Sequence, residues 1–590
     1  MKMTERIFSF QSMPPIYRNH NKKFTPTGVN FLYYILHASK YYDKIKITVI
    51  LEDIMSITIK QLSSLAKVYQ DKIFGKTKKQ IRVARGQTFS YQIAYKGEGE
   101  YTYKIKSPLK KYIKVYQLGF VPCQLPTYEK CNDGRYQRLD ASVMYPDPLT
   151  PKAKNKIKAE KSYNAIWLNV ELPKDIEAGK YPISVAFSDG QEAVFTVNIE
   201  NIAFEEKEIV FTQWFHTDCI ANVHKAEVYS EKHWDLIEKY IKMATDHGIN
   251  MLLIPALTPP LDTAVGGERT TVQLVDITYD NGKYSFDFTK FRRFVEIAKN
   301  NGVKYFEINH MFTQWGAKHA PKVIATVNGE KKRIFGWETD ATSEEYKIFL
   351  EALIPSIIKE LTLMGIDKKH IVFHASDEPN MDCIENYRKA TEILQPLIDG
   401  CVQMDALSDL EFYKRGLIKR PVCGIDHILK FIEAGVPNMW GYYCCAQTWE
   451  VSNRFFAMSS ERNRIIGAQI YKYALEGFLH WGYNFYYTQY SKKKINPYKV
   501  TDAGGAFPSG DSFSVYPYRN GVIPSLRLKV FKEALDDVSL LYMLENKIGR
   551  KKTIELLDRI AETEITFKNY PDSERFFEQL SNAIFEELKK

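Results

Sequence analysis

Two consecutive carboxylates, Asp377 and Glu378, stand in the segment His374-Ala-Ser-Asp-Glu-Pro-Asn380 and are the residues of this chain best placed to do chemistry. Neighbouring carboxyl groups can divide acid and base roles, because each raises the pKa of the other. The same residues could instead cap the helix that follows. The sequence alone leaves both interpretations open.

The elements around this pair place it at the end of a buried strand. Apolar spacing predicts a helix from Glu345 to Met364, which Gly365 ends, and the apolar run 371–373 then predicts a short strand. In a parallel barrel, the carboxyl ends of the strands form the active site. Pro379 should hold Glu378 in an extended conformation and end the strand.

Length and composition favour a globular protein of two domains. The chain has 590 residues, of which 45% are hydrophobic and 14% aromatic, so disorder is excluded. The net charge of +10 comes from short lysine runs spread along the chain, such as 76–79 and 492–494. Neither a basic element nor a known module predicts nucleic-acid binding.

No apolar leader and no membrane-spanning run is visible, so we expect a cytoplasmic protein. The eight cysteines are scattered, and we expect buried free thiols rather than a structural zinc site. Cys444 and Cys445 should point to opposite faces of one strand. The sequence does not indicate an oligomeric state.

The N-terminal part, residues 1–205, is predicted to be an antiparallel β-sandwich. Short strand-like runs alternate with turns between about residues 40 and 204. The run 31–36 is ambiguous, and Tyr145-Pro-Asp-Pro-Leu149 is expected to be a rigid loop. The expected strands are 44–50, 81–84, 89–95, 101–105, 114–119, 165–170, 180–187 and 193–199.

The period changes near residue 206, and residues 206–590 are predicted to form a (β/α)8 TIM barrel with C-terminal helices. Eight apolar runs alternate with room for helices, as this barrel requires. Asp280-Asn-Gly282 predicts a hairpin inside the second βα loop. The expected barrel strands are 210–215, 251–254, 304–308, 371–373, 401–404, 421–425, 439–445 and 478–487.

The predicted strand ends gather polar and aromatic side chains at one rim, including five of the twelve histidines. Aromatic planes pack on the C–H faces of sugars, and polar groups bind their hydroxyls. Most of these rings could equally fill the core, and Trp440, Tyr442 and Trp481 are the ones most expected to line a pocket. The candidate substrate-binding residues are His216, Asp218, His310, Trp315, Asp405, Trp440, Tyr442 and Trp481.

Acids and rings at a barrel rim favour a glycosidase, because carboxyl groups protonate the leaving oxygen and stabilise an oxocarbenium-like transition state. The usual pair comes from separate strands. Two consecutive acids suggest that a 2-acetamido group of the substrate attacks instead, with one carboxylate orienting its N–H. The alternatives are a glycosidase for non-acetylated sugars, with Asp405 or Asp426 as the nucleophile, and an inactive carbohydrate-binding protein.

An ordered series of motifs resembles glycoside hydrolase family 123, the β-N-acetylgalactosaminidases, and related uncharacterised bacterial proteins. The motifs are Tyr145 to Leu149, Trp167 to Tyr181, Trp214-Phe-His-Thr-Asp-Cys219, His310-Met-Phe-Thr-Gln-Trp-Gly316, Phe373 to Pro379, Trp440-Gly-Tyr-Tyr-Cys444 and Gly510-Asp-Ser-Phe-Ser-Val-Tyr-Pro517.

This resemblance implies a sandwich-plus-barrel enzyme without metal or cofactor. It would release terminal β-linked N-acetylgalactosamine, with retention, from an oligosaccharide or glycolipid glycan. It implies that Glu378 is the general acid/base, that Asp377 holds the acetamido group, and that Tyr442 donates to the acetamido oxygen.

Overall fold

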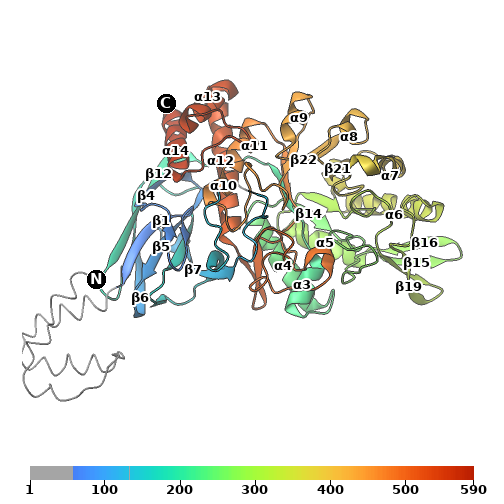
Figure 1. The fold of residues 1–590 in the computed structure, drawn as a ribbon, viewed down its shortest axis with the longest axis horizontal. Helices are drawn as coiled ribbons and strands as arrows, with labels where there is room; N and C mark the ends of the chain where they lie inside the picture. Colours follow the sequence, from blue (N-terminus) through green and yellow to red (C-terminus); the bar gives the residue numbers. More distant parts are fainter. Residues whose placement is uncertain (1–56, 132) are drawn as a thin grey trace, which may run out of the picture.

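The computed structural model describes residues 57–131 and 133–590. Strands of the N-terminal part form one lobe, and a barrel surrounded by helices forms the other (Figure 1). The runs 31–36 and 44–50 lie outside the described residues. Within the described ranges, no helix combines the length and the apolar character needed to cross a bilayer.

The N-terminal region is sandwich-like, with two five-stranded sheets ordered β1-β5-β10-β7-β8 and β4-β12-β11-β6-β9. Rings from both sheets meet between them, as in the stacked pair Tyr91 and Phe195, whose centroids lie 4.1 Å apart. The seven expected strands from residue 81 onward are confirmed. Their bounds and those of three unexpected strands are β1 (Thr58–Ser63), β4 (Gln80–Arg85), β5 (Thr88–Lys96), β6 (Gly99–Lys106), β7 (Ile113–Pro122), β8 (Met144–Pro151), β9 (Lys156–Ala159), β10 (Asn164–Glu171), β11 (Gly179–Phe187) and β12 (Glu192–Ala203).

Two expectations about this region were wrong. Tyr145 to Leu149 belongs to strand β8 rather than to a loop. β8 is the edge strand of its sheet, next to β7, and an edge strand tolerates prolines, which have no N–H to donate. The region is also not purely antiparallel, since β12 pairs with β4 in parallel. A short hairpin, β2 (Lys67–Val68) with β3 (Ile73–Phe74), lies beside the sheets.

Eight parallel strands close into the barrel in chain order, and at least one helix follows each of them. The eight strand predictions are confirmed, although the seventh and eighth strands end early. Tyr442 ends β23, so Cys444 and Cys445 lie beyond the strand and not on its opposite faces. The barrel strands are β13 (Val210–Gln213), β14 (Met251–Ile254), β17 (Tyr305–Ile308), β20 (Ile371–Phe373), β21 (Val402–Ala406), β22 (Arg420–Gly424), β23 (Trp440–Tyr442) and β24 (Gly477–His480).

The α-helices that follow the barrel strands or close the chain carry an apolar stripe towards the strands or towards the sandwich-like region. They are α3 (Thr217–His224), α4 (Glu231–Thr245), α5 (Thr289–Asn300), α6 (Glu344–Leu363), α7 (Ile384–Leu397), α8 (Glu411–Lys414), α9 (Ile428–Glu433), α10 (Ser460–Arg464), α11 (Ile466–Lys472), α12 (Leu526–Ile548), α13 (Arg550–Ala561) and α14 (Glu574–Lys589).

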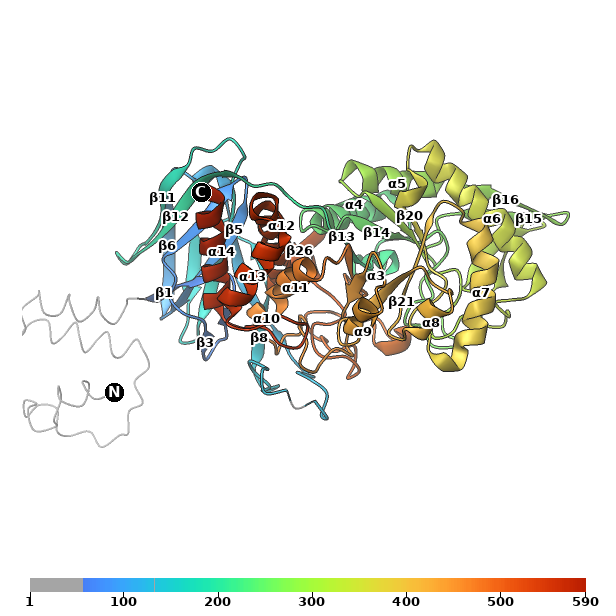
Figure 2. The same cartoon turned by 90° about the horizontal axis from the view of Figure 1, so that it is seen from above.

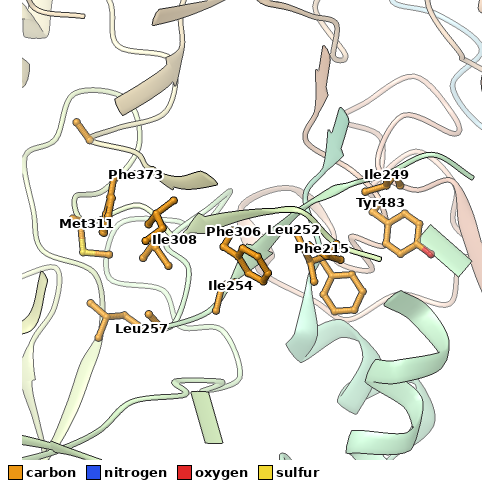
Figure 3. Close-up of a cluster of buried hydrophobic side chains, with 14 of the residues drawn as sticks. Phe215, Ile249, Leu252, Ile254, Leu257, Phe306, Ile308, Met311, Phe373 and Tyr483 are labelled. Carbon is orange, nitrogen blue, oxygen red and sulfur yellow. The ribbon is translucent and has the colours of Figure 1, made fainter. Parts of the chain in front are cut away.

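The largest apolar core surrounds the barrel strands. Leu252, Ile254, Phe306 and Ile308 alternate along two neighbouring strands and are all buried (Figure 3). This period of two sends one set of side chains outwards to the helices, while the intervening residues fill the barrel. The barrel interior is therefore packed with side chains.

The predicted hairpin in the second βα loop is confirmed as β15 (Asp276–Asp280) and β16 (Lys283–Asp287). The third βα loop adds a second hairpin, β18 (Val323–Val327) and β19 (Glu330–Phe335). The two hairpins join into one sheet ordered β16-β15-β18-β19. The second and third βα loops are thus fixed to each other, which matters for the cavity between them.

The last three helices connect the two regions. Leu541 of α12 and Phe577 of α14 share a buried cluster with Trp167 and Leu62 of the outer face of the β1–β8 sheet. Figure 2 shows α12 to α14 lying beside the sandwich strands rather than around the barrel. The predicted division at residues 205 and 206 remains a prediction, with the C-terminal helices bridging it.

A buried ion pair joins the N-terminal region to the end of the barrel. Arg527 of α12 makes two bonds of 2.9 Å to the carboxylate of Asp147 in β8. The same guanidinium donates to the carbonyls of Gly510 (2.6 Å) and Phe513 (2.9 Å) in the last loop. Tyr516 donates to Asp147 as well, at 2.5 Å. One guanidinium therefore fixes strand, helix and loop together.

We predict that Asp147→Ala destabilises the protein by about 3–5 kcal/mol, because it leaves the Arg527 charge buried without a partner. Urea unfolding followed by circular dichroism measures the change. The control is Asp71→Ala, which removes an exposed ion pair to Arg138 at 2.7 Å and should cost less than about 1 kcal/mol. Equal losses in the two variants would contradict the role given to the buried pair.

Candidate active site

A cavity of about 200 Å³ opens at the carboxyl ends of the barrel strands. Both Asp377 and Glu378 lie in its wall. The other lining residues are Trp214, His216, Leu261, Asp262, Gln314, Trp315, Ala406, Tyr442, Cys444, Cys445, Leu479, Trp481, Phe485, Gln489 and Phe507. A larger cleft of about 540 Å³ lies between the sandwich strands and the C-terminal helices. Two of its acids, Glu533 and Asp537, form ion pairs with Arg464.

The backbone around the two acids is held in an unusual conformation. Glu378 has a φ of 44°, in the left-handed region, so the expected extended conformation before Pro379 was wrong. Its N–H donates to the carbonyl of Ala406 at 3.0 Å, and the carbonyl of Asp377 accepts from Trp315 N–H at 2.9 Å. Neighbouring strand ends thus impose a strained conformation that local preference disfavours, as is common at functional sites.

The two carboxyl groups differ in their hydrogen bonds. Tyr442 O–H donates to Glu378 Oε1 at 2.7 Å, and the thiol of Cys444 lies 4.0 Å from the same oxygen. No described residue donates a hydrogen bond to the Asp377 carboxylate. Burial raises the pKa of Asp377 well above its usual value, and repulsion from Glu378 raises it further. Burial also raises the pKa of Glu378, which the Tyr442 hydrogen bond partly offsets.

A chain of buried ionisable groups lies directly beneath the acids. His374 Nε2 lies 2.7 Å from Glu307 Oε1, and its Nδ1 lies 3.5 Å from Asp405 Oδ1. Burial would lower the pKa of His374, but the two carboxylates outweigh it and raise the pKa to about 10. Trp214 Nε1 donates to Glu307 at 2.7 Å, and Tyr387 O–H donates to Asp405 at 2.6 Å. An imidazolium between two carboxylates thus supports the loop that carries Asp377.

His310, His374 and Asp405 place possible ligand atoms within 4.8 Å of one another. However, the two imidazole rings are stacked, with centroids 4.4 Å apart and planes inclined by 18°. An ion lies in the plane of each imidazole that binds it, so stacked rings cannot share one ion in this way. His374 is also engaged by two carboxylates. The group therefore fits an ion-pair network and not a metal site.

His216 lines the cavity, whereas Asp218 supports it from behind. Arg269 binds Asp218 through bonds of 2.7 and 3.0 Å and also donates to His216 Nδ1 at 3.1 Å. His216 Nε2 therefore carries the proton and donates to the carbonyl of Trp481 at 3.1 Å. Burial, with the Arg269 charge, lowers the pKa of His216 to about 3. His216 is a neutral wall residue with both nitrogens occupied.

Three of the expected aromatic residues line the cavity, and one does not. Trp315, with 43% of its surface exposed, stands at the rim, and Trp481 and Tyr442 lie in the wall. Trp481 Nε1 donates to Asp511 Oδ2 at 2.8 Å, which fixes the ring. Trp440 is only 2% exposed and packs against Gly477 at the start of the neighbouring strand. Since Trp440 begins β23 and Tyr442 ends it, only Tyr442 reaches the open end.

The structure also places His310 and Asp405 below the cavity rather than in its wall. It adds residues that the sequence did not single out: Asp262, Gln314 and the buried Glu307. Glu307 lies inside a strand, where it is the one acid among apolar neighbours, and this was an available signal. Asp262 and Gln314 lie in long βα loops, where no periodic pattern indicates their positions.

Comparison with known proteins agrees with this geometry. The sequence model described as the catalytic domain of glycoside hydrolase 123 matches residues 214–544, more than half of the chain. A search of curated proteins finds no match.

Among solved structures, a family 123 glycoside hydrolase from Clostridium perfringens, studied for glycolipid glycan hydrolysis, aligns with a TM-score of 0.67. The two chains are 13% identical, and the alignment covers 90% of this chain and 98% of that one. A family 5 mannosidase from Rhizomucor miehei aligns with a TM-score of 0.34 at 11% identity, covering 60% of this chain and 96% of that one.

The family match spans the strands that carry the cavity, and it includes both Asp377 and Glu378. The structural alignment extends the likeness of fold to the N-terminal region. The chain therefore belongs to glycoside hydrolase family 123 and is a glycosidase.

Proposed function

We propose that this protein is a retaining exo-glycosidase that releases terminal β-linked N-acetylgalactosamine by substrate-assisted catalysis on a TIM-barrel domain. The observation that carries the proposal is the pair Asp377 and Glu378 in one cavity, where Tyr442 donates to Glu378 and no residue within the described ranges donates to the Asp377 carboxylate. A carboxylate without a donor is ready to accept the N–H of an acetamido group. The galacto configuration rests on the family resemblance.

In the proposed first step, the Glu378 carboxyl protonates the glycosidic oxygen while the substrate's acetamido oxygen attacks the anomeric carbon. The bond to the leaving group breaks, and a cyclic oxazolinium ion forms. Asp377 accepts the acetamido N–H and stabilises the positive charge that develops on this group. In the second step, Glu378 takes a proton from water, and the water oxygen attacks the anomeric carbon from the face that the leaving group occupied. The oxazolinium ring opens, and the product retains the β configuration.

The electrostatics of the cavity suit the transfer of a proton from Asp377 to Glu378 when the substrate binds. Two repelling carboxyl groups in a partly dry site keep one proton between them. Without substrate, the Tyr442 donor favours ionised Glu378, so the proton resides on the Asp377 side. An acetamido N–H supplies the missing donor to Asp377 and thereby favours its ionised form. The proton then moves to Glu378, where the leaving oxygen needs it.

The runner-up is a glycosidase whose own carboxylate attacks the sugar. The two residues first considered for that role lie outside the cavity wall. Asp405 is buried and bound by Tyr387, and Asp426 accepts from Gln447 at 2.9 Å and lies 2.9 Å from His427. The structure thus offers no support for either as the nucleophile, which favours the acetamido group. The Clostridium relative's glycolipid glycan suggests the same substrate class here.

We predict that wild type releases phenols from the β-N-acetylgalactosaminide and not from the plain β-galactoside. Glu378→Gln should lower kcat about 10²- to 10⁴-fold, because general acid catalysis is lost. The loss should be larger for a phenol than for a nitrophenol leaving group, since nitrophenolate needs less protonation. Equal activity of wild type and Glu378→Gln, or hydrolysis of the plain galactoside, would contradict the proposed mechanism.

Asp377→Asn should lower kcat about 10²-fold or more on acetamido substrates. An amide can face the acetamido N–H with its own oxygen, but it carries no charge to stabilise the oxazolinium ion. Binding of the product N-acetylgalactosamine, measured by calorimetry, should change less than tenfold. If kcat stays within threefold of wild type, Asp377 does not hold the role proposed for it.

Tyr442→Phe should move the alkaline limb of the kcat profile, which reports the enzyme–substrate complex in which Glu378 carries the proton, upwards by about 0.5 to 1 pH unit. Tyr442 donates to the Glu378 carboxylate and lowers the pKa of Glu378, so its removal raises that pKa. Glu378 then remains protonated to a higher pH, and general acid activity persists there. A limb that stays in place or moves downwards would assign the alkaline pKa to another group.

A further inference from the structure

A third carboxylate, Asp262, lines the cavity and plays no part in the proposed chemistry. It belongs to the second βα loop, and its backbone is fixed by two other loops. Its N–H donates to Gln314 Oε1 at 2.6 Å, and its carbonyl accepts from Ser491 Oγ at 2.7 Å. Its φ of 39° lies in the left-handed region, which a non-glycine residue rarely adopts. Three loops therefore hold this carboxylate in one strained position.

Gln314, the partner of Asp262, presents an unused donor beside it. Because Gln314 Oε1 accepts the Asp262 N–H, the amide orientation is fixed and Nε2 faces away from that bond. The Nε2 group is buried and has no hydrogen-bond partner among residues 57–131 and 133–590, and Gln314, only 7% exposed, lines the cavity. A buried donor without a partner costs about 1–3 kcal/mol, so a ligand that accepts from it is favoured.

The Asp262 carboxylate has accepting capacity to spare. Among the described residues, only the N–H of Tyr490 donates to it, at 3.0 Å, and that bond uses Oδ2 alone. An ionised carboxylate can accept about four hydrogen bonds. Burial raises the pKa of Asp262 to about 6, so the group is largely ionised at neutral pH. Asp262 and its hydrogen-bonded neighbour Gln314 thus bring one acceptor and one donor to a wall that is otherwise largely apolar and aromatic.

We propose that Asp262 and Gln314 form the specificity site for two neighbouring hydroxyls of the terminal sugar, including the 4-hydroxyl. This inference rests on the proposed function, in which Asp377 serves the acetamido group, and Glu378, with its donor Tyr442, serves the glycosidic oxygen. The hydroxyls that remain are those on carbons 3, 4 and 6. The neighbouring pairs are the hydroxyls on carbons 3 and 4 and those on carbons 4 and 6, and both pairs contain the 4-hydroxyl. The 4-hydroxyl donates to Asp262, and one hydroxyl of the bound pair accepts from Gln314.

The test is a double-mutant cycle between the protein and the substrate, with kcat/KM measured for the nitrophenyl β-N-acetylgalactosaminide and its 4-deoxy analogue. In wild type, deoxygenation should lower kcat/KM about 10- to 100-fold, the value of a hydrogen bond to a charged group. In Asp262→Ala the same deoxygenation should cost less than about threefold. Gln314→Glu, which keeps the oxygen that accepts from Asp262 but loses the Nε2 donor, should lower kcat/KM for the acetylgalactosaminide itself.

The control is Asp280→Ala, which removes an exposed carboxylate from the hairpin of the same βα loop and should keep the full penalty. A penalty of equal size in wild type and Asp262→Ala would overturn the proposal. If kcat in Asp262→Ala also falls equally for both substrates, Asp262 acts independently of the 4-hydroxyl.

Failure of the proposed function is distinguishable from failure of this inference. Calorimetry on wild type and Asp262→Ala, with the product N-acetylgalactosamine and its 4-deoxy form, measures hydroxyl recognition without turnover. Coupling to Asp262 in these affinities supports the inference even if Glu378→Gln proves fully active. If wild type is active and Glu378→Gln is not, while neither assay shows coupling between Asp262 and the 4-hydroxyl, the inference is overturned and the proposed function stands.

Discussion

Two carboxyl groups on consecutive residues cannot both ionise freely in a cavity with little water, and the surrounding structure answers this constraint. Tyr442 donates to Glu378, whereas Asp377 receives no donor from the part of the chain that the structure describes, so the two acids are chemically unequal although they are neighbours. The inequality is a matter of about 1 kcal/mol per hydrogen bond, which a substrate N–H can reverse. In the proposed mechanism, the proton that the two acids share therefore moves from Asp377 to Glu378 when the substrate binds.

The buried network beneath the acids keeps their loop in place. His374 precedes Asp377 by three residues, and its charge is held between Glu307 and Asp405. Ser376 N–H donates to Asp405 at 3.2 Å, so the same carboxylate fixes the backbone of the loop. Further out, the Arg527 guanidinium fixes the last loop to the N-terminal region. The N-terminal region thus contributes to the rigidity of the cavity without touching the reacting atoms.

Much of the architecture was predictable, because short apolar strands and their spacing are local signals. Each of the eight barrel strands was found from its own apolar run, and Asp377 and Glu378 were found because they follow one of them. The strand β8 was missed because its prolines hide an edge strand whose pairing is visible only in three dimensions. The φ of Glu378 was missed because hydrogen bonds to Ala406 and Trp315, both distant in sequence, hold this backbone.

The wall of the cavity was less predictable than its floor. Trp440 and Tyr442 lie on one face of β23, and the sequence does not say which of the two rings reaches the open end of the barrel. Asp262 and Gln314 are far from strand ends, and only folding of the second and third βα loops brings them together. Specificity residues on long loops carry no periodic signal, whereas catalytic residues at strand ends do.

The central claim is that the substrate's acetamido oxygen is the nucleophile, with Glu378 as the acid. The most direct measurement is kcat/KM for nitrophenyl glycosides whose acetyl group carries zero, one, two or three fluorines. Fluorine withdraws electrons from the attacking oxygen without greatly changing its shape. The account predicts a steep, continuous fall in rate with each fluorine. A flat series would show that the acetamido oxygen does not attack, and it would contradict the mechanism.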